Sequence, residues 1–206
     1  MGQRWRDCIV TVIDMVGVKK RARDGNASTA MRRLHALVTR EMGALQSVAH
    51  AYVWNDSVLL LSYVNEGDAS FQSAIRDAEK LKRRIDDLAG SYAIAVKGRA
   101  FPLTQGGHSP ARTSRVTVIE ASSWAMANCF EVEKALATKW RKPWYIDIRI
   151  ARKIRTCQSF HADTVKLLPT GRARRVHVFD GYLWDAPATR RNTPPPSGAD
   201  TNKGAP

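Results

Sequence analysis

The sequence has few cysteines, no long apolar run and no excess of acidic residues. Its 206 residues contain three cysteines, Cys8, Cys129 and Cys157, and these lack metal-ligand spacing, which indicates reduced thiols. No apolar run approaches the ~20 residues that a membrane helix needs. The N-terminus lacks the small-residue cleavage site of a signal peptide. Together these absences predict a cytoplasmic protein that does not enter a membrane.

The charge is strongly positive instead. Formal net charge is +14, which favours polyanionic partners such as nucleoside triphosphates or nucleic acid. The basic residues are widely spread, and no run interleaves them with aromatics as a single-strand platform would. We therefore expect a nucleotide partner and no nucleic acid, although a basic nucleic-acid-binding module remains an alternative.

Hydrophobic periodicity predicts one domain over residues 1–185 and a disordered tail over 186–206, which is rich in Pro, Gly, Asn and Thr. Helices are expected after Ser28 or Thr29, over 69–88 and over 123–140. Strands are expected over 8–18, on both sides of a turn at 55–56, and over 91–102, 115–121, 144–154 and 175–183. The order predicts an α+β fold, a ferredoxin-like mixed sheet with helices mainly on one face.

Two aspartates stand out in this arrangement. Asp14 interrupts the most apolar strand of the chain, and Asp56 lies in the turn of the hairpin. Forty-two positions separate them, which leaves room for one crossover helix, so both side chains can meet at one edge of the sheet. Taken singly, Asp14 could cap a turn and Asn55-Asp56 could be an ordinary turn. Two converging carboxylates need compensation, which favours a divalent-metal site.

The segments Asp14-Met15-Val16-Gly17 and Asn55-Asp56 resemble the metal-binding strand-loop and hairpin of class III nucleotidyl cyclases. This resemblance implies that Asp14 and Asp56 hold two Mn²⁺ or Mg²⁺ ions, that Met15 adds a backbone carbonyl, and that amides around Gly17 face the phosphates. It also implies a homodimer with active sites at the interface.

The base-reading positions differ from purine cyclases, in which a lysine stands four residues before the second aspartate. Tyr52 occupies that place, and Arg99 ends a strand that could line the same pocket. Tyr52 and Arg99 resemble the pocket of the bacterial Pycsar pyrimidine cyclases. That likeness implies conversion of UTP to cyclic UMP and pyrophosphate, as a signal to a separate effector in antiviral defence.

The helix over 123–140 carries Asn128 where the family places a transition-state asparagine, but the arginine of the family motif is missing. Arg112 or Arg115 could replace it, or turnover could be slow. Cyclic CMP or cyclic AMP production, and nucleotide sensing without turnover, are the alternatives within the same fold.

Overall fold

A computed structural model describes residues 5–17, 23–25, 27–100, 124–136, 143–157, 160–166 and 173–185. The regular elements over these residues are, in chain order, β1 (Arg6–Met15), α2 (Ala27–Glu41), a 3-10 turn (Met42–Ala44), β2 (His50–Trp54), β3 (Ser57–Tyr63), α3 (Asp68–Asp86), β4 (Ser91–Ala100), α4 (Trp124–Leu136), β5 (Trp144–Asp147), α5 (Ile148–Ala151), β6 (Phe160–Lys166) and β7 (Ala173–Phe179). Within these residues, no helix combines the length and apolar character that crossing a bilayer requires.

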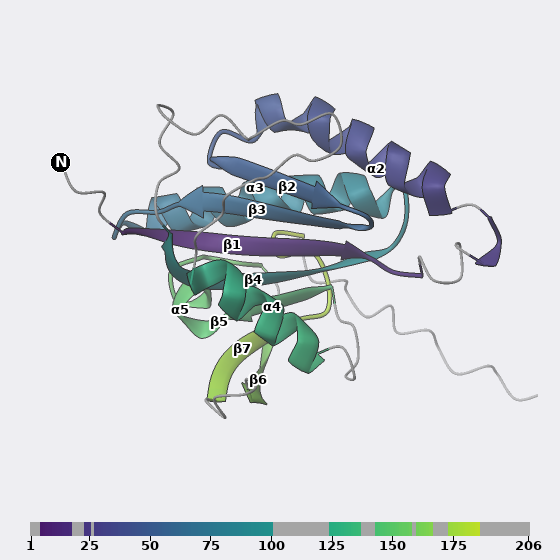
Figure 1. The fold of residues 1–206 in the computed structure, drawn as a ribbon. Coiled ribbons are helices and arrows are strands. Elements are labelled where there is room, and N and C mark those ends of the chain that lie inside the picture. Colours follow the sequence, from purple (N-terminus) through teal and green to yellow (C-terminus); the bar gives the residue numbers. More distant parts are fainter. Residues whose placement is uncertain are drawn as a thin grey trace, which may run out of the picture.

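The strands form one mixed sheet in the order β2-β3-β1-β4-β5-β7-β6 (Figure 1). β1 pairs antiparallel with both β3 and β4, and β4 pairs parallel with β5. β1 to β4, with α2 and α3 as crossovers, make the ferredoxin-like unit. The predicted α+β fold class is therefore confirmed.

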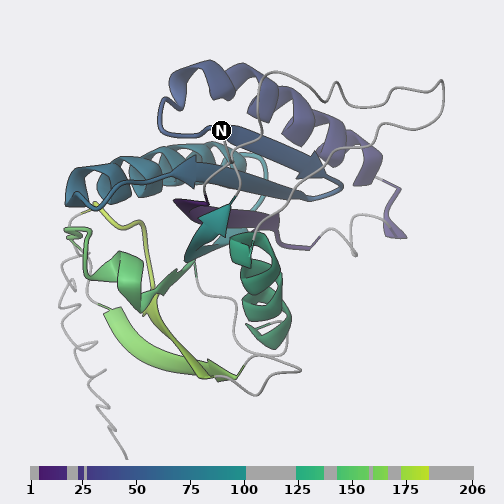
Figure 2. The same ribbon diagram turned by 60° about the vertical axis from the view of Figure 1, so that its left-hand side comes forward.

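β1 is buried on both faces, which explains its nearly continuous apolar sequence. Ile9 and Ile13 pack in one core cluster with side chains of α2 and α3, whereas Val10 and Val12 pack in a second cluster with α4. The two views of the ribbon agree, with α2 and α3 on one side of the sheet and α4 on the other (Figures 1 and 2). Asp14 shares the parity of Val10 and Val12 along the strand, which places it on the α4 face.

Each of the crossover helices α2 and α3 buries one apolar face. Leu34 and Val38 of α2 are 0% and 2% exposed. Phe71, Ile75, Ala78, Leu81 and Ile85 of α3 are all buried, as spacings of three and four residues predict. The hairpin is also confirmed, with Asn55 and Asp56 joining β2 to β3.

The second half of the sheet differs from the prediction in three places, one of which is that the strand expected over 175–183 is β7, which ends at Phe179. The expected strand over 144–154 ends at Asp147, because the Asp147 side chain accepts a hydrogen bond from the Arg149 amide (2.9 Å) and caps the short helix α5. β6 was not predicted at all. The predicted strand over 115–121 and the tail over 186–206 lie outside the described residues.

The last described segment is fastened to α3. The Tyr182 hydroxyl donates to Asp86 (2.7 Å), and the Leu183 amide donates to Glu79 (2.7 Å). Lys82, 1% exposed, also donates to Asp86 (2.6 Å). The contacts of Tyr182 and Leu183 hold residues 182–185 against α3.

Candidate active site

The sheet brings the backbones of Asp14 and Asp56 together at one edge. Asp14 lies opposite Ser57 in the β1–β3 register, so Asp56 is the next residue toward the turn. The Met15 amide donates to the Asp56 carbonyl over 3.0 Å, which closes the ladder at this end. Two segments far apart in the sequence thus present their aspartates from adjoining positions.

The conformation of each turn suits its residue type. Asn55 has a φ of 48°, in the left-handed region that asparagine tolerates better than most residues. Asn55 and Asp56 therefore form a tight two-residue turn, in which Asn55 is exposed and Asp56 is half-buried. After β1, Gly17 has a φ of 86°, and a Cβ there would meet no atom within 4 Å, so backbone conformation rather than space requires glycine.

The loop after β1 leaves the sheet immediately beyond Met15. The Val16 amide donates to the Gly90 carbonyl (2.7 Å), and the Val16 side chain is 40% exposed. Met15 itself is buried, at 2% exposure. The Met15 carbonyl therefore lies where the buried strand β1 ends and the exposed loop begins.

The carboxylate of Asp14 is buried, at 9% exposure, and is held by hydroxyl groups. The Ser57 hydroxyl donates to its Oδ1 atom over 2.6 Å. Tyr92, the residue opposite Asp14 on β4, forms a side-chain hydrogen bond with it as well. The Tyr92 hydroxyl also donates to Glu133 of α4 over 3.1 Å. Burial, together with the two neighbouring carboxylates, raises the pKa of Tyr92 well above its ordinary range, so the phenol stays protonated.

The donor set at this edge fits a hard divalent cation. Within the described part of the chain, no three Asp, Glu, His or Cys side chains are grouped to enclose a metal ion. Mg²⁺ sites of nucleotide enzymes commonly use one or two carboxylates and take their other oxygens from phosphates and water. Asp14 and Asp56 could supply the carboxylate ligands of such a site, and the Met15 carbonyl could supply one further oxygen.

Tyr52 lies on the same face of the sheet as Asp14. It is opposite Leu59 on β3, and Leu59 is opposite Val12 on β1, so Tyr52 is two strands across and two residues back from Asp14. The ring is half-buried against the α4-side cluster. Burial, with a smaller effect from Tyr63, raises the pKa of Tyr52.

Arg99 lies elsewhere. It pairs with Asp7 at the far end of β1, whereas Asp14 pairs with Tyr92. Its side chain, 69% exposed, forms an ion pair with Asp7 over 3.5 Å. Asp7 also binds Lys97, whose ammonium lies over the Phe71 ring of α3 at 5.4 Å, so this pair is on the α3 side of the sheet. Within one chain, Arg99 therefore meets neither Tyr52 nor Asp14.

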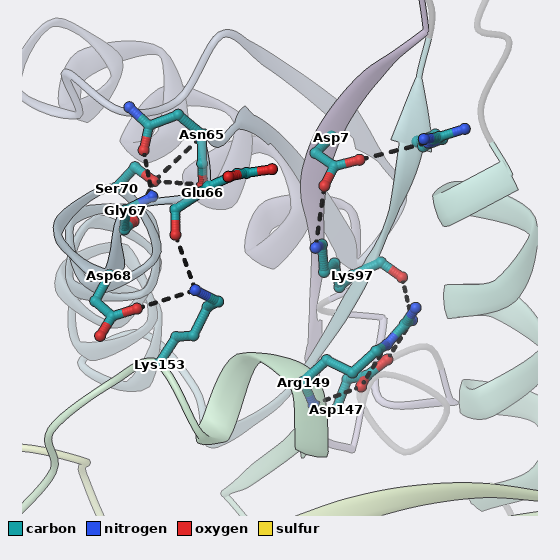
Figure 3. Close-up of polar contacts among 11 residues, drawn as sticks. Asp7, Asn65, Glu66, Gly67, Asp68, Ser70, Lys97, Asp147, Arg149 and Lys153 are labelled. Atoms are coloured by element: carbon teal, nitrogen blue, oxygen red, sulfur yellow. Dashed lines mark hydrogen bonds and ion pairs between the residues drawn. The ribbon is translucent and has the colours of Figure 1, made fainter.

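The polar contacts at the Arg99 end form a separate group of charges (Figure 3). Asp147, 1% exposed, pairs with Arg149 (2.8 Å) and Arg174 (3.1 Å). Arg149 also donates to the Lys97 carbonyl over 2.6 Å, which joins α5 to β4. This group stabilises the second half of the sheet and is distinct from the edge that carries Asp14.

Asn128 lies on α4 at the margin of the helix's buried face. It is half-buried and precedes Cys129, which is fully buried against β1 and β4. Arg112 and Arg115 lie outside the described residues. Ser57, Tyr92 and Glu133 are the residues near Asp14 that the sequence did not single out.

Comparisons with known proteins support the fold. No protein-family model and no curated protein matches the sequence. Solved structures do match, among them the guanylyl cyclase Cya2, at 10% identity and a TM-score of 0.60 over 88% of this chain and 95% of that one. A bacterial light-regulated adenylyl cyclase matches at 11% identity and a TM-score of 0.58, over 87% and 93% of the two chains.

The guanylate cyclase domain of RhGC from Catenaria anguillulae, solved in complex with GTP, matches at 13% identity and a TM-score of 0.54. The match covers 84% of this chain and 96% of that domain. The sheet and helices described above thus have the same fold as the cyclase domains in these structures.

Proposed function

We propose that this protein is a metal-dependent nucleotide cyclase that converts UTP to 3′,5′-cyclic UMP and pyrophosphate. The observation that carries the proposal is the meeting of Asp14 and Asp56 at one edge of a cyclase-type sheet, joined by the hydrogen bond from the Met15 amide to the Asp56 carbonyl (3.0 Å). Two aspartates whose backbones adjoin at one edge of this fold suit chemistry at a triphosphate.

In this proposal Asp14, Asp56 and the Met15 carbonyl hold two Mn²⁺ or Mg²⁺ ions. Such ions neutralise triphosphate charge and make the ribose 3′-hydroxyl a better nucleophile. Ser57 and Tyr92 keep the Asp14 carboxylate oriented. The amides around Gly17 face the phosphates in the exposed loop.

The reaction balances without another reactant. The 3′-oxygen forms a bond to the α-phosphorus, the bond from that phosphorus to the bridging oxygen breaks, and pyrophosphate leaves with the electron pair. The hydroxyl proton leaves with solvent water. Asn128 is proposed to stabilise the transition state by donating a hydrogen bond from its amide.

The base is assigned to Tyr52 and Arg99. Tyr52 shares a face of the sheet with Asp14 and can stack on a pyrimidine or hydrogen-bond to it. Arg99 is at the other end of the sheet in the same chain, so its contact with a nucleotide requires a second subunit. We therefore propose a homodimer with active sites at the interface.

The cellular role follows from the likeness of Tyr52 and Arg99 to the Pycsar cyclases. Cyclic UMP would be a second messenger in bacterial antiviral defence, read by a separate effector protein.

The test is incubation of the purified protein with each of four labelled nucleoside triphosphates and Mn²⁺. We expect cyclic UMP and pyrophosphate from UTP, and a loss of at least about a hundredfold in Asp14→Ala and Asp56→Ala. Cyclic CMP or cyclic AMP instead would correct the base assignment only. The proposal that the protein is a nucleotide cyclase would be overturned if no nucleotide gave a cyclic product, or if Asp56→Ala kept full activity.

One observation favours a second candidate. The described part of α4 contains Asn128 and Lys134 but no arginine, so the family's cationic group for the transition state is missing from it. A protein that binds nucleotides without turnover would fit this helix. Equilibrium binding of labelled UTP with no product after prolonged incubation would select it.

A further inference from the structure

Trp54 lies in the same row across the sheet as Asp14, the proposed metal ligand. Trp54 is opposite Ser57 on β3, and Ser57 is opposite Asp14 on β1. Residues directly opposite each other in antiparallel strands point to the same face, so the Trp54 indole is on the α4 face of the sheet with Asp14. β2 is two strands from β1, about 10 Å away at the usual strand spacing. That separation is comparable to the reach of a nucleotide from its base to its phosphates.

Phe130 approaches Trp54 from the helix side. α4 packs on β4 and β1, and β3 and β2 lie on the other side of β1 (Figure 1). The Phe130 ring extends from this helix to Trp54, with the ring centroids 5.6 Å apart and the ring planes tilted by 52°. Phe130 is 38% exposed and Trp54 is half-buried. The rings are therefore in contact without a parallel stack, and both keep surface that a ligand can reach.

Tyr52 is the neighbour of Trp54 along β2. It precedes Trp54 by two residues, so both side chains point to the α4 face, where both pack at the margin of the same core cluster. The phenol of Tyr52 can hydrogen-bond to the edge of a base, whereas an indole offers a broad flat surface to the face of a base. The two aromatic residues can therefore contact different parts of one base.

We propose that Trp54, with Phe130 beside it, is the surface on which the base of the bound nucleotide stacks. The inference rests on the proposed function, because it takes Asp14 to hold the phosphates of that nucleotide through metal ions. Stacking on an aromatic side chain adds affinity for any base, since every base has a π-face. Trp54 therefore contributes affinity for the nucleotide, and Tyr52 contributes the choice of base.

The test compares two probes in the presence of Mn²⁺ by isothermal titration calorimetry. 3′-deoxy-UTP lacks the hydroxyl group that attacks the α-phosphorus, so it binds without being converted to product. Inorganic tripolyphosphate has the phosphate chain without a base. We expect the wild type to bind 3′-deoxy-UTP more tightly than tripolyphosphate. Trp54→Leu should weaken binding of 3′-deoxy-UTP about five- to a hundredfold, as the loss of one stacking ring does, and should leave tripolyphosphate within about twofold.

Three further measurements sharpen the test. Trp54→Phe keeps an aromatic face and should bind 3′-deoxy-UTP within about fivefold of the wild type. 3′-deoxy-ATP should lose affinity in Trp54→Leu to a similar extent, because a purine stacks as well. Phe160→Ala is the matched control for Phe130→Ala, since Phe160 is 52% exposed but stacks on His177 at 3.9 Å. Phe130→Ala should weaken 3′-deoxy-UTP about threefold or more, and Phe160→Ala should bind both probes as the wild type does.

The outcomes separate the stacking surface from the metal site. The stacking role is wrong if the wild type binds the two probes equally, if Trp54→Leu binds 3′-deoxy-UTP as the wild type does, or if Trp54→Leu weakens both probes equally. The metal site still stands in these cases when Asp14→Asn weakens both probes. If Asp14→Asn binds both probes as the wild type does, the metal site is wrong, and a selective loss in Trp54→Leu would still support the stacking surface. If the wild type binds neither probe, both proposals fall.

Discussion

Asp86 at the end of α3 accepts hydrogen bonds from both the backbone amide and the hydroxyl of Ser91, over 2.7 and 2.6 Å. Ser91 begins β4 and directly precedes Tyr92, so this contact fixes the start of the strand that reaches Asp14. Because Lys82 and Tyr182 also donate to Asp86, one carboxylate joins the helix, the strand and the last described segment.

This arrangement predicts a large loss of stability in Asp86→Ala. The variant leaves the Lys82 ammonium, 1% exposed, without its ion-pair partner. Removal of one member of a buried pair costs about 3 kcal/mol or more. Urea unfolding at neutral pH measures the difference. Asp87→Ala, at the exposed next position, is the control and should lie within about 0.5 kcal/mol of the wild type.

Gly98→Ala should displace α4. The new methyl group would meet the Ala125 Cβ at 2.6 Å and the Ala125 Cα at 2.7 Å, and the Cα belongs to the backbone, which cannot rotate away. We expect a loss of about 1–3 kcal/mol in unfolding free energy. Gly43→Ala is the matched control, since a Cβ there meets no atom within 4 Å. Equal stability of the two variants would contradict the close contact.

Asp77 should make the protein less stable in acid. Burial raises the pKa of its carboxyl, but hydrogen bonds from Ser47 and Lys80 outweigh burial and bring the pKa below its ordinary value of 3.8. A depressed folded-state pKa means that the carboxylate contributes stability above the unfolded-state pKa, and that this is lost as the pH falls through the folded-state pKa.

The wild type should therefore exceed Asp77→Asn in unfolding free energy at about pH 6, and the gap should shrink at about pH 3. Urea unfolding at both pH values checks this. Ser47→Ala removes the 2.6 Å hydroxyl donor to Asp77 and should show a smaller gap of the same pH dependence. A gap that widens in acid would reverse the sign and reject the explanation.

Tyr52→Lys should change the choice of base. A lysine at this half-buried position replaces an aromatic ring by a flexible cation, so we expect kcat/KM for UTP to fall about ten- to a hundredfold relative to a purine nucleotide. Parallel assays with UTP, CTP and ATP measure the ratio. Unchanged ratios would remove Tyr52 from base recognition while leaving the assignment of Asp14 and Asp56 intact.

The sequence alone predicted the elements whose signals are local. The stripe of α3 repeats every three or four residues, and Asn55-Asp56 interrupts two β-rich segments, so both elements are marked by their own residues. The end of β1 and the hairpin turn could be assigned to one edge because a single crossover helix joins them.

The neighbours of Asp14 could not be predicted in this way. That Tyr92 faces Asp14 depends on the β1–β4 register, which pairing of distant segments determines. That Glu133 reaches Tyr92 depends on the rotation of α4 against the sheet. Neither the β1–β4 register nor the rotation of α4 can be read from a local sequence pattern.

The missed elements have physical reasons too. In the run from Trp144, Ile146, Ile148 and Ile150 alternate with polar residues as in a half-buried strand, and the capping carboxylate of Asp147 instead begins a helix there. β6 is an edge strand with Phe160 52% exposed and polar residues on both faces, so it lacks the alternation that marks a half-buried strand. The face of β4 that Arg99 takes also depends on the register of β4 with β1, which the order of strands does not reveal.

The contacts between residues 182–185 and α3 have a practical consequence for anyone who shortens this protein. Cutting the chain ahead of Tyr182 would strip a donor from Asp86 and expose the Glu79 carboxylate that the Leu183 amide now covers. Expression fragments should therefore extend through Asp185, although this stretch contributes no strand or helix of its own.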